Sequence, residues 1–138
     1  MKIKYANDKV KQQCTSLKTA IKLFGGNKKL ATSLLARINA IEGAVVIKDI
    51  IAMPTFHFHN LHGNLEGFFA IDVKGRKDKW RIILQPLDED EQPFDPCHID
   101  EIAVVVRIVE IREVRPAMKS QVEIEAIFAG NFLLLSMA

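Results

Sequence analysis

Residues 67–84 have the sequence GFFAIDVKGRKDKWRIIL, and this stretch decides the fold class. Residues 67–73 and 80–84 are rich in β-branched and aromatic side chains, which is typical of strands. The residues between them include one glycine and four cations, a composition that favours an exposed turn. The stretch therefore predicts a β-hairpin with a strongly basic loop.

Upstream of the hairpin, the sequence is mostly helical in pattern. Residues 2–5 alternate lysine with apolar side chains, which predicts a short first strand. Asn7 or Asp8 is then expected to cap a helix whose apolar stripe runs through residues 10–24 at spacings of three and four. The glycine pair at 25–26 is expected to end this helix.

A second helix is predicted after those glycines. Asn27 is its expected N-cap, residues 30–41 repeat the apolar stripe, and Gly43 ends it. The two helices are joined closely enough to form a helical hairpin. Most of its cations lie off the stripes and are expected to project into solvent: Lys9, Lys11, Lys18, Lys22, Lys28, Lys29 and Arg37.

The remaining segments complete an α+β fold with at least four strands. Residues 45–53 predict a helical turn before a proline, and the alternation in residues 56–59 (FHFH) predicts the first strand after it. Residues 87–101 form an acidic loop with two prolines, and residues 102–111 are an apolar, β-branched run typical of a central strand.

With 138 residues, the chain has the usual size of one domain. We expect this domain to span residues 1–116, with residues 117–138 as an extension that forms a hairpin. That hairpin would cover an exposed sheet edge or make a homodimer contact. The sequence shows neither a secretory leader nor an apolar run long enough to span a membrane, so a cytoplasmic protein is expected. Cys14 and Cys97 have no metal-like or redox-like spacing and are expected to be reduced.

Charge is distributed unevenly along the chain, although the formal total is only +2. Residues 1–81 contain 15 Lys and Arg and 6 Asp and Glu, a charge of +9. Residues 82–138 contain the other 4 basic and 11 acidic residues, a charge of −7. The basic part can attract a polyanion such as RNA, and the acidic part limits the reach of that field.

Three histidines precede the basic turn, at positions 57, 59 and 62. Histidine is the commonest metal ligand, but no carboxylate or cysteine pattern completes a set, so no metal site is expected. Imidazole beside cations suits phosphodiester cleavage, because it moves protons near neutral pH while cations hold phosphate charge. The simpler alternatives are a solvated loop for the turn and a solvent-facing side chain for Arg81, which lies inside a predicted strand.

The order of these segments resembles the RelE-like toxins of the HigB, or plasmid-killer, branch of type II toxin–antitoxin systems, over about residues 1–115. Residues 59–63, HNLHG, match the family's His-x-Leu-x-Gly. Residues 81–86, RIILQP, are similar to its Arg-Leu-Ile-Phe-x-Pro, and residues 105–111, VVRIVEI, match its last shared strand. The resemblance implies a strand and helical hairpin packed on a mostly antiparallel, twisted sheet of four to five strands.

The resemblance also implies an activity. Such toxins are endoribonucleases that cleave mRNA on the ribosome, and a cognate antitoxin, here expected to be a helix-turn-helix protein, neutralises them. The ribose 2′-OH attacks the adjacent phosphate, and no metal or organic cofactor takes part. By position, the implied catalytic residues are His59 for proton transfer, Arg81 for phosphate, His62 in place of a common lysine, and Glu113. The implied RNA-binding cations are Lys74, Arg76, Lys77 and Lys79.

Two positions depart from the family pattern. Leu65 stands where the family usually has arginine, and Val114 stands where it usually has an aromatic residue. An aromatic side chain can stack on a base, a contact worth about 1–3 kcal/mol that valine cannot replace in kind. The alternative hypothesis is therefore a catalytically impaired RelE-like domain that binds RNA, the ribosome or a partner protein.

Overall fold

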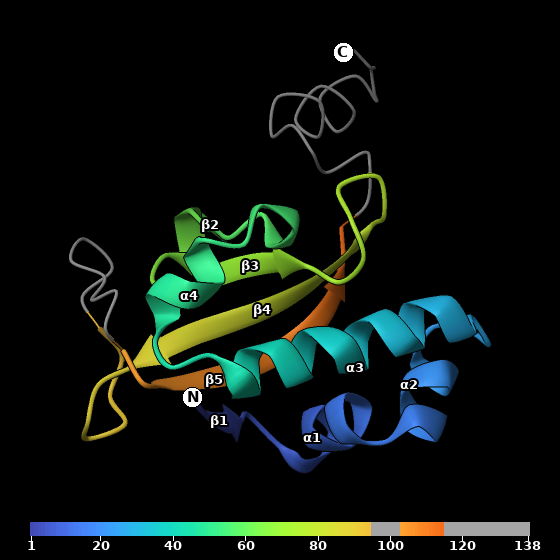
Figure 1. Cartoon of the computed structure of the whole chain (residues 1–138), viewed down its shortest axis with the longest axis horizontal. Coiled ribbons are helices and arrows are strands. Elements are labelled where there is room, and N and C mark those ends of the chain that lie inside the picture. Colours follow the sequence, from blue (N-terminus) through green and yellow to red (C-terminus); the bar gives the residue numbers. More distant parts are fainter. Residues whose placement is uncertain (95–102, 115–138) are drawn as a thin grey trace.

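The computed structural model describes residues 1–94 and 103–114, which fold around one five-stranded sheet (Figure 1). The strand order is β1-β5-β4-β3-β2. β1 runs parallel to β5, and the other neighbours are antiparallel. The strands are β1 (Lys2–Tyr5), β2 (His59–Asn60), β3 (Phe69–Asp72), β4 (Trp80–Leu87) and β5 (Val105–Glu113). The predicted α+β class, with an N-terminal strand and a mostly antiparallel sheet, is confirmed.

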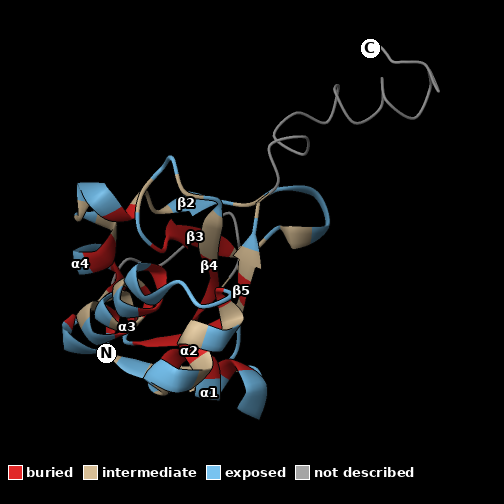
Figure 2. Cartoon of the chain, turned by 90° about the vertical axis from the view of Figure 1, so that its right-hand side faces the viewer, coloured by how far each residue is buried: buried red, intermediate tan, exposed pale blue. Residues whose placement is uncertain are grey.

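Four α-helices accompany the sheet in the described part of the chain: α1 (Asp8–Thr15), α2 (Leu17–Leu23), α3 (Lys28–Gly43) and α4 (Ile47–Ile51). The first three lie along one face of the sheet (Figure 1). Buried residues, red in Figure 2, lie where the helices and the strands face each other, and they form one core. The predicted second helix corresponds to α3, and the predicted helical turn near residue 50 corresponds to α4, so both are confirmed. The predicted Asn27 cap is also confirmed, because Asn27 Oδ1 accepts a hydrogen bond from the Leu30 amide.

The predicted first helix is broken in two at Ser16, so the single helix expected through residue 24 is wrong. Ser16 has extended backbone angles, and its Oγ accepts a hydrogen bond from the Thr19 amide. A serine whose Oγ accepts a hydrogen bond from the amide three residues later is an N-cap, and an N-cap marks the start of a new helix. The expected apolar stripe is interrupted at the break, because Leu17 is 48% exposed, although α1 and α2 both pack on the core through Cys14 and Ala20.

Alternating side chains divide the sheet into two faces. Ile71, Ile82 and Ile111 belong to the core beneath the helices. Their sequence neighbours Asp72, Arg81 and Arg112 point to the other face, because successive residues of a strand alternate. The expected β3–β4 hairpin is confirmed and pairs Asp72 directly with Arg81. Polar groups therefore collect on the face without α1–α3.

The strand predicted for residues 56–59 is wrong in most of its length. Pro54–Phe56 form a 3₁₀ turn, and His57 follows with φ 50° and ψ 52°, in the left-handed region. A residue in that region breaks the alternation of a strand. Only His59–Asn60 pair with β3 as β2.

The acidic loop after β4 is described through residue 94. Asp88 closes a turn by accepting hydrogen bonds from the Asp90 and Gln92 amides. Glu91 lies 3.4 Å from Lys2 Nζ and 3.2 Å from Lys4 Nζ, and the hydrogen bond from Lys4 is the main cause of its lowered pKa. This loop carboxylate therefore pairs with β1.

Residues 95–102 and 115–138 lie outside the described part, and so do the expected extension at 117–138 and the domain boundary. Within the residues that the structure describes, no helix is long and apolar enough to cross a membrane.

Candidate functional site

A cavity of about 380 Å³ lies on the sheet face that carries the polar groups. Residues of β2, β3, β4 and the end of β5 form its walls, together with the turn after β2 and the basic loop. The lining residues are His59, Leu61, Leu65, Ala70, Asp72, Arg76, Arg81, Ile83, Arg112 and Val114. One exposed imidazole and three guanidinium groups thus share a cavity with one buried carboxylate.

His59 is held in a defined orientation at the cavity edge. Its backbone pairs with Ala70 of β3, and its Nδ1 lies 2.6 Å from the carbonyl oxygen of His57. A carbonyl oxygen only accepts hydrogen bonds, so Nδ1 must carry the hydrogen. In the neutral ring, Nε2 is then unprotonated and can accept a proton. The neutral form of His59 in this orientation is therefore the tautomer that a general base needs.

Arg81 is anchored from several sides. Its Nε lies 3.1 Å from Asp72 Oδ1, and the Arg81 and Asp72 side chains are 15% and 2% exposed. Nη1 donates to the carbonyl oxygens of Asp78 (2.7 Å) and Trp80 (2.9 Å), and Nη2 donates to that of Arg76 (3.4 Å). Most of the five donor hydrogens of Arg81 thus hold the basic loop in shape, although its side chain also lines the cavity.

The second carboxylate oxygen of Asp72 is buried and has no hydrogen-bond partner within the described residues. His57 Nε2 lies 3.9 Å away, beyond hydrogen-bond distance. A buried polar atom without a partner costs about 1–3 kcal/mol, and more when it is charged. Asp72 therefore has one oxygen paired with Arg81 and one oxygen available for a donor.

Arg37 does not project into solvent as expected from its place off the apolar stripe. Its Nε donates to the main-chain oxygen of Asp72 (2.9 Å), and its Nη2 donates to those of Thr55 and Lys74 (3.3 Å each). Its guanidinium lies 4.2 Å from the centre of the Phe56 ring. Burial lowers the pKa of Arg37, and Asp72 opposes this shift. Arg37 therefore links α3 to the end of β3 and the chain before β2.

Arg112 is a residue of the cavity that no sequence motif indicated. It pairs with Arg81 across β4 and β5 and lines the cavity, and its Nη2 lies 2.6 Å from Glu110 Oε2. Both partners are 40% exposed, so a phosphate could compete for this arginine. The alternation of side chains along β5 could have indicated it. Because successive residues of a strand point to opposite faces, Arg112 and Val114 share one face and Glu113 points to the other.

The departures from the family pattern both line the cavity. Leu65 and Val114 face it together with Leu61, Ala70 and Ile83, so part of its wall is apolar. The Val114 amide donates to the carbonyl oxygen of Lys79 at 2.6 Å, which fixes the end of β5 beside the basic loop.

Two residues of the implied catalytic set lie elsewhere. Glu113 pairs with Trp80, whose ring packs edge-on against Phe24 of the helical layer. It lines a different cavity of about 410 Å³ with Asn7 and Lys9 of the N-terminal region. His62 is exposed at the start of a short 3₁₀ turn and is not in the lining of the His59 cavity. The structure thus brings His59 and Arg81 together without Glu113 or His62.

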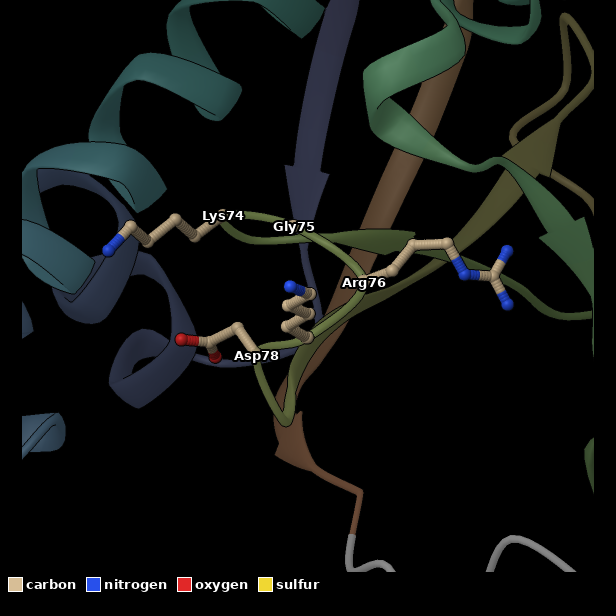
Figure 3. A pocket seen from close by; sticks show the side chains of 5 residues that line it. Lys74, Gly75, Arg76 and Asp78 are labelled. Atoms are coloured by element: carbon tan, nitrogen blue, oxygen red, sulfur yellow. The ribbon is translucent and has the colours of Figure 1, made fainter.

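The basic loop presents its cations in different directions (Figure 3). Arg76 points away from Lys74 and Asp78, and it lines the His59 cavity. Residues 74–78 surround a separate hollow of about 390 Å³. Lys74, Arg76, Lys77 and Lys79 are all exposed. Of these four predicted RNA-binding cations, Arg76 is the one placed to act at the cavity.

The part of the chain described by the structure contains no group of three His, Cys, Asp or Glu side chains that could hold a metal ion. No family model matches the sequence, and no curated protein matches it. Among solved structures, the chain is similar to a crystal structure of YafQ from E. coli strain BL21(DE3), with 13% sequence identity and a TM-score of 0.42. The similarity covers 86% of this chain and 97% of the YafQ chain. This likeness is too distant to assign a family.

Proposed function

We propose that this protein is a ribosome-dependent mRNA endonuclease, the toxin of a type II toxin–antitoxin system related to the HigB branch. The observation that carries the proposal is the placement of His59. Its Nε2 is available to accept a proton, and it lies at a cavity lined by Arg76, Arg81 and Arg112. A base beside several cations suits attack by a ribose 2′-OH on the adjacent phosphate.

In this mechanism His59 Nε2 removes the proton of the 2′-OH, and the 2′-oxygen bonds to phosphorus as the bond from phosphorus to the 5′-oxygen of the next nucleotide breaks. The products are a 2′,3′-cyclic phosphate and a 5′-hydroxyl, whose proton comes from the His59 imidazolium or from water. Arg76 and Arg112 are the exposed or half-exposed cations of the cavity, and they stabilise the charge that develops on the phosphate oxygens. Arg81 keeps the loop that carries Arg76 in place through its bonds to Asp72, Asp78 and Arg76. No step of this scheme requires a metal ion.

The proposed partners follow from this activity. mRNA on the ribosome is the substrate, a helix-turn-helix antitoxin is the inhibitor, and the site of action is the cytoplasm. A reading frame for such a small protein beside the gene would favour the proposal strongly, and its absence would weaken it.

The decisive experiment is inducible expression with mapping of mRNA 5′ ends. His59→Asn removes Nε2, whereas the Asn amide can still donate to the His57 carbonyl as Nδ1 does. We expect the parent to arrest growth and produce new mRNA ends, and His59→Asn to do neither. His62→Asn, at an exposed histidine outside the cavity lining, is the matched control and should retain the activity. Equal cleavage by parent and His59→Asn would reject the site.

The second candidate is an RNA-binding or ribosome-binding domain that does not cleave. The apolar side chains of Leu65 and Val114 in the cavity wall favour it, because they replace an expected cation and an expected stacking group. This function predicts salt-dependent binding of RNA or ribosomes without new mRNA ends.

A further inference from the structure

Four side chains form a continuous row beside the cavity: Arg76, His57, Asp72 and Arg81. Arg76 Nη1 lies 3.4 Å from His57 Nδ1, and His57 Nε2 lies 3.9 Å from Asp72 Oδ2. At the other carboxylate oxygen, Arg81 Nε completes the row at 3.1 Å. The His57 ring has no role in the proposed mechanism, and Asp72 acts there only through the contact of its Oδ1 with Arg81. The row therefore holds an imidazole and a second carboxylate oxygen without an assigned function.

The row defines the state of the His57 ring. A guanidinium can donate hydrogen bonds but cannot accept them, so Nδ1 of His57 accepts from Arg76. The hydrogen of the neutral ring is therefore on Nε2, which faces the unpartnered Oδ2 of Asp72. The ring is held by Arg76 on one side and stops short of a hydrogen bond to Asp72 on the other.

We propose that His57 and Asp72 form a proton-binding pair that closes when an RNA phosphate takes Arg76 away from His57. Without its cationic neighbour, His57 Nδ1 takes up a proton from solvent, and the imidazolium moves onto Asp72 Oδ2. The inference deepens the proposed function and rests on it for the choice of RNA as the ligand. Phosphate binding and proton uptake are then linked events at this site.

The surrounding charges favour this sequence of events. Asp72 from β3 and Arg76 from the basic loop face the His57 ring directly. Arg81 from β4 stays paired with Asp72 Oδ1, and Arg37 from α3 stays on the main-chain oxygen of Asp72. His59 of β2 contacts the His57 carbonyl. When a phosphate binds Arg76, it neutralises the charge of this guanidinium. The repulsion between Arg76 and a protonated His57 ring is then removed, whereas the attraction between that ring and the Asp72 carboxylate remains.

The pair would act as a positioning device for His59. The carbonyl oxygen of His57 holds Nδ1 of His59, and His57 has left-handed backbone angles in a segment between a 3₁₀ turn and β2. Fixing the His57 ring on Asp72 would restrain this segment when the substrate is bound. The orientation of His59 would then be fixed more firmly when RNA is bound in the cavity than when the cavity is empty.

Proton uptake can be measured by calorimetric titration of the full chain with a 2′-O-methyl oligoribonucleotide, which has no 2′-OH for attack. Its phosphodiesters do not titrate near pH 7, so the binding enthalpy in buffers of different ionisation enthalpy reports protons taken up by the protein. We expect a net uptake of up to one proton by the parent. His57→Asn should abolish it, because asparagine tolerates left-handed backbone angles but does not titrate. His62→Asn should leave it unchanged.

Asp72→Asn provides a second arm, because the amide keeps an acceptor for Arg81 but cannot stabilise an imidazolium, so the uptake should fall. If Asp72→Asn does not fold, His57→Asn alone decides. No uptake by the parent, uptake that persists in His57→Asn, uptake lost only in His59→Asn, or no binding of the oligonucleotide would each overturn the proposal. Cleavage that depends on His59 without proton uptake would reject the pair and keep the nuclease. Proton uptake without any cleavage on ribosomes would keep the His57–Asp72 pair and reject the nuclease.

Discussion

Asp72 and Arg81 face each other directly across the β3–β4 hairpin, with Arg81 Nε 3.1 Å from Asp72 Oδ1. The carboxylate is almost fully buried, so removing the guanidinium leaves a charge without compensation. We expect Arg81→Ala to lower the free energy of unfolding by about 3–5 kcal/mol, as measured by urea denaturation.

Arg112→Ala is the control for that substitution. Arg112 and its partner Glu110 are both 40% exposed, so the loss should be about 1 kcal/mol or less. Equal losses in the two variants would contradict the anchoring role of Arg81. Because Arg81→Ala also perturbs folding, growth arrest by this variant is a less specific test of the chemistry than arrest by His59→Asn.

Val114→Tyr should strengthen RNA binding. Val114 lines the cavity at the end of β5, and a tyrosine there can stack on a base, which contributes about 1–3 kcal/mol. The corresponding gain in affinity, about 5-fold to 150-fold, can be measured by fluorescence anisotropy with a labelled oligoribonucleotide. Val45→Tyr, at a valine that is 72% exposed and outside the lining, should change affinity little. No difference between the two variants would place the bases elsewhere.

Arg76→Ala should weaken RNA binding more than Lys74→Ala. Both residues are exposed cations of the same loop, but Arg76 lines the cavity and Lys74 points in another direction (Figure 3). Loss of one phosphate contact should reduce the slope of log affinity against log salt by about 0.7 for single-stranded RNA. Salt titrations of the two variants test this, and equal slopes would show that the loop binds RNA through its net charge.

The protein should lose stability in alkali through Cys14. Burial raises the pKa of the Cys14 thiol to about 12, whereas the pKa of a cysteine thiol in the unfolded chain is about 8.5. The unfolded state therefore releases a proton above about pH 8.5 that the folded state keeps, and stability falls as pH rises toward 12. In a Cys97→Ser background, we expect a fall of about 1–2 kcal/mol between pH 8 and pH 10, measured by urea denaturation. Cys14→Ala should show a smaller fall, and an equal fall would assign it to other groups.

The sequence predicted correctly those elements that depend on residues close together in the chain, such as helix caps and turns. Asn27 caps α3 as expected, and the basic turn joins two paired strands. The break at Ser16 had a local signal, a serine that can cap, but the uninterrupted apolar stripe concealed it. The left-handed backbone of His57 had no such signal, because the FHFH alternation is a normal strand pattern.

The candidate site depended more on distant pairing. His59 and Arg81 were named from the sequence, and both line the cavity. Asp72 and Arg112 were not, because their roles depend on the register of β4 with its neighbours, including a shift between Ile83 and Leu84. A sequence pattern does not specify which arginine on β5 stands opposite Arg81.

The parallel pairing of β1 with β5 has a consequence for the nascent chain. Lys2 of β1 pairs with Val105 of β5, so β1 can join the sheet only after β5 has been synthesised. Arg112 and Val114 reach the cavity only with that strand. Long-range pairing of this kind slows folding. A product of interrupted translation that ends before β5 would therefore lack the complete cavity, which can form only after the chain has been synthesised through Val114.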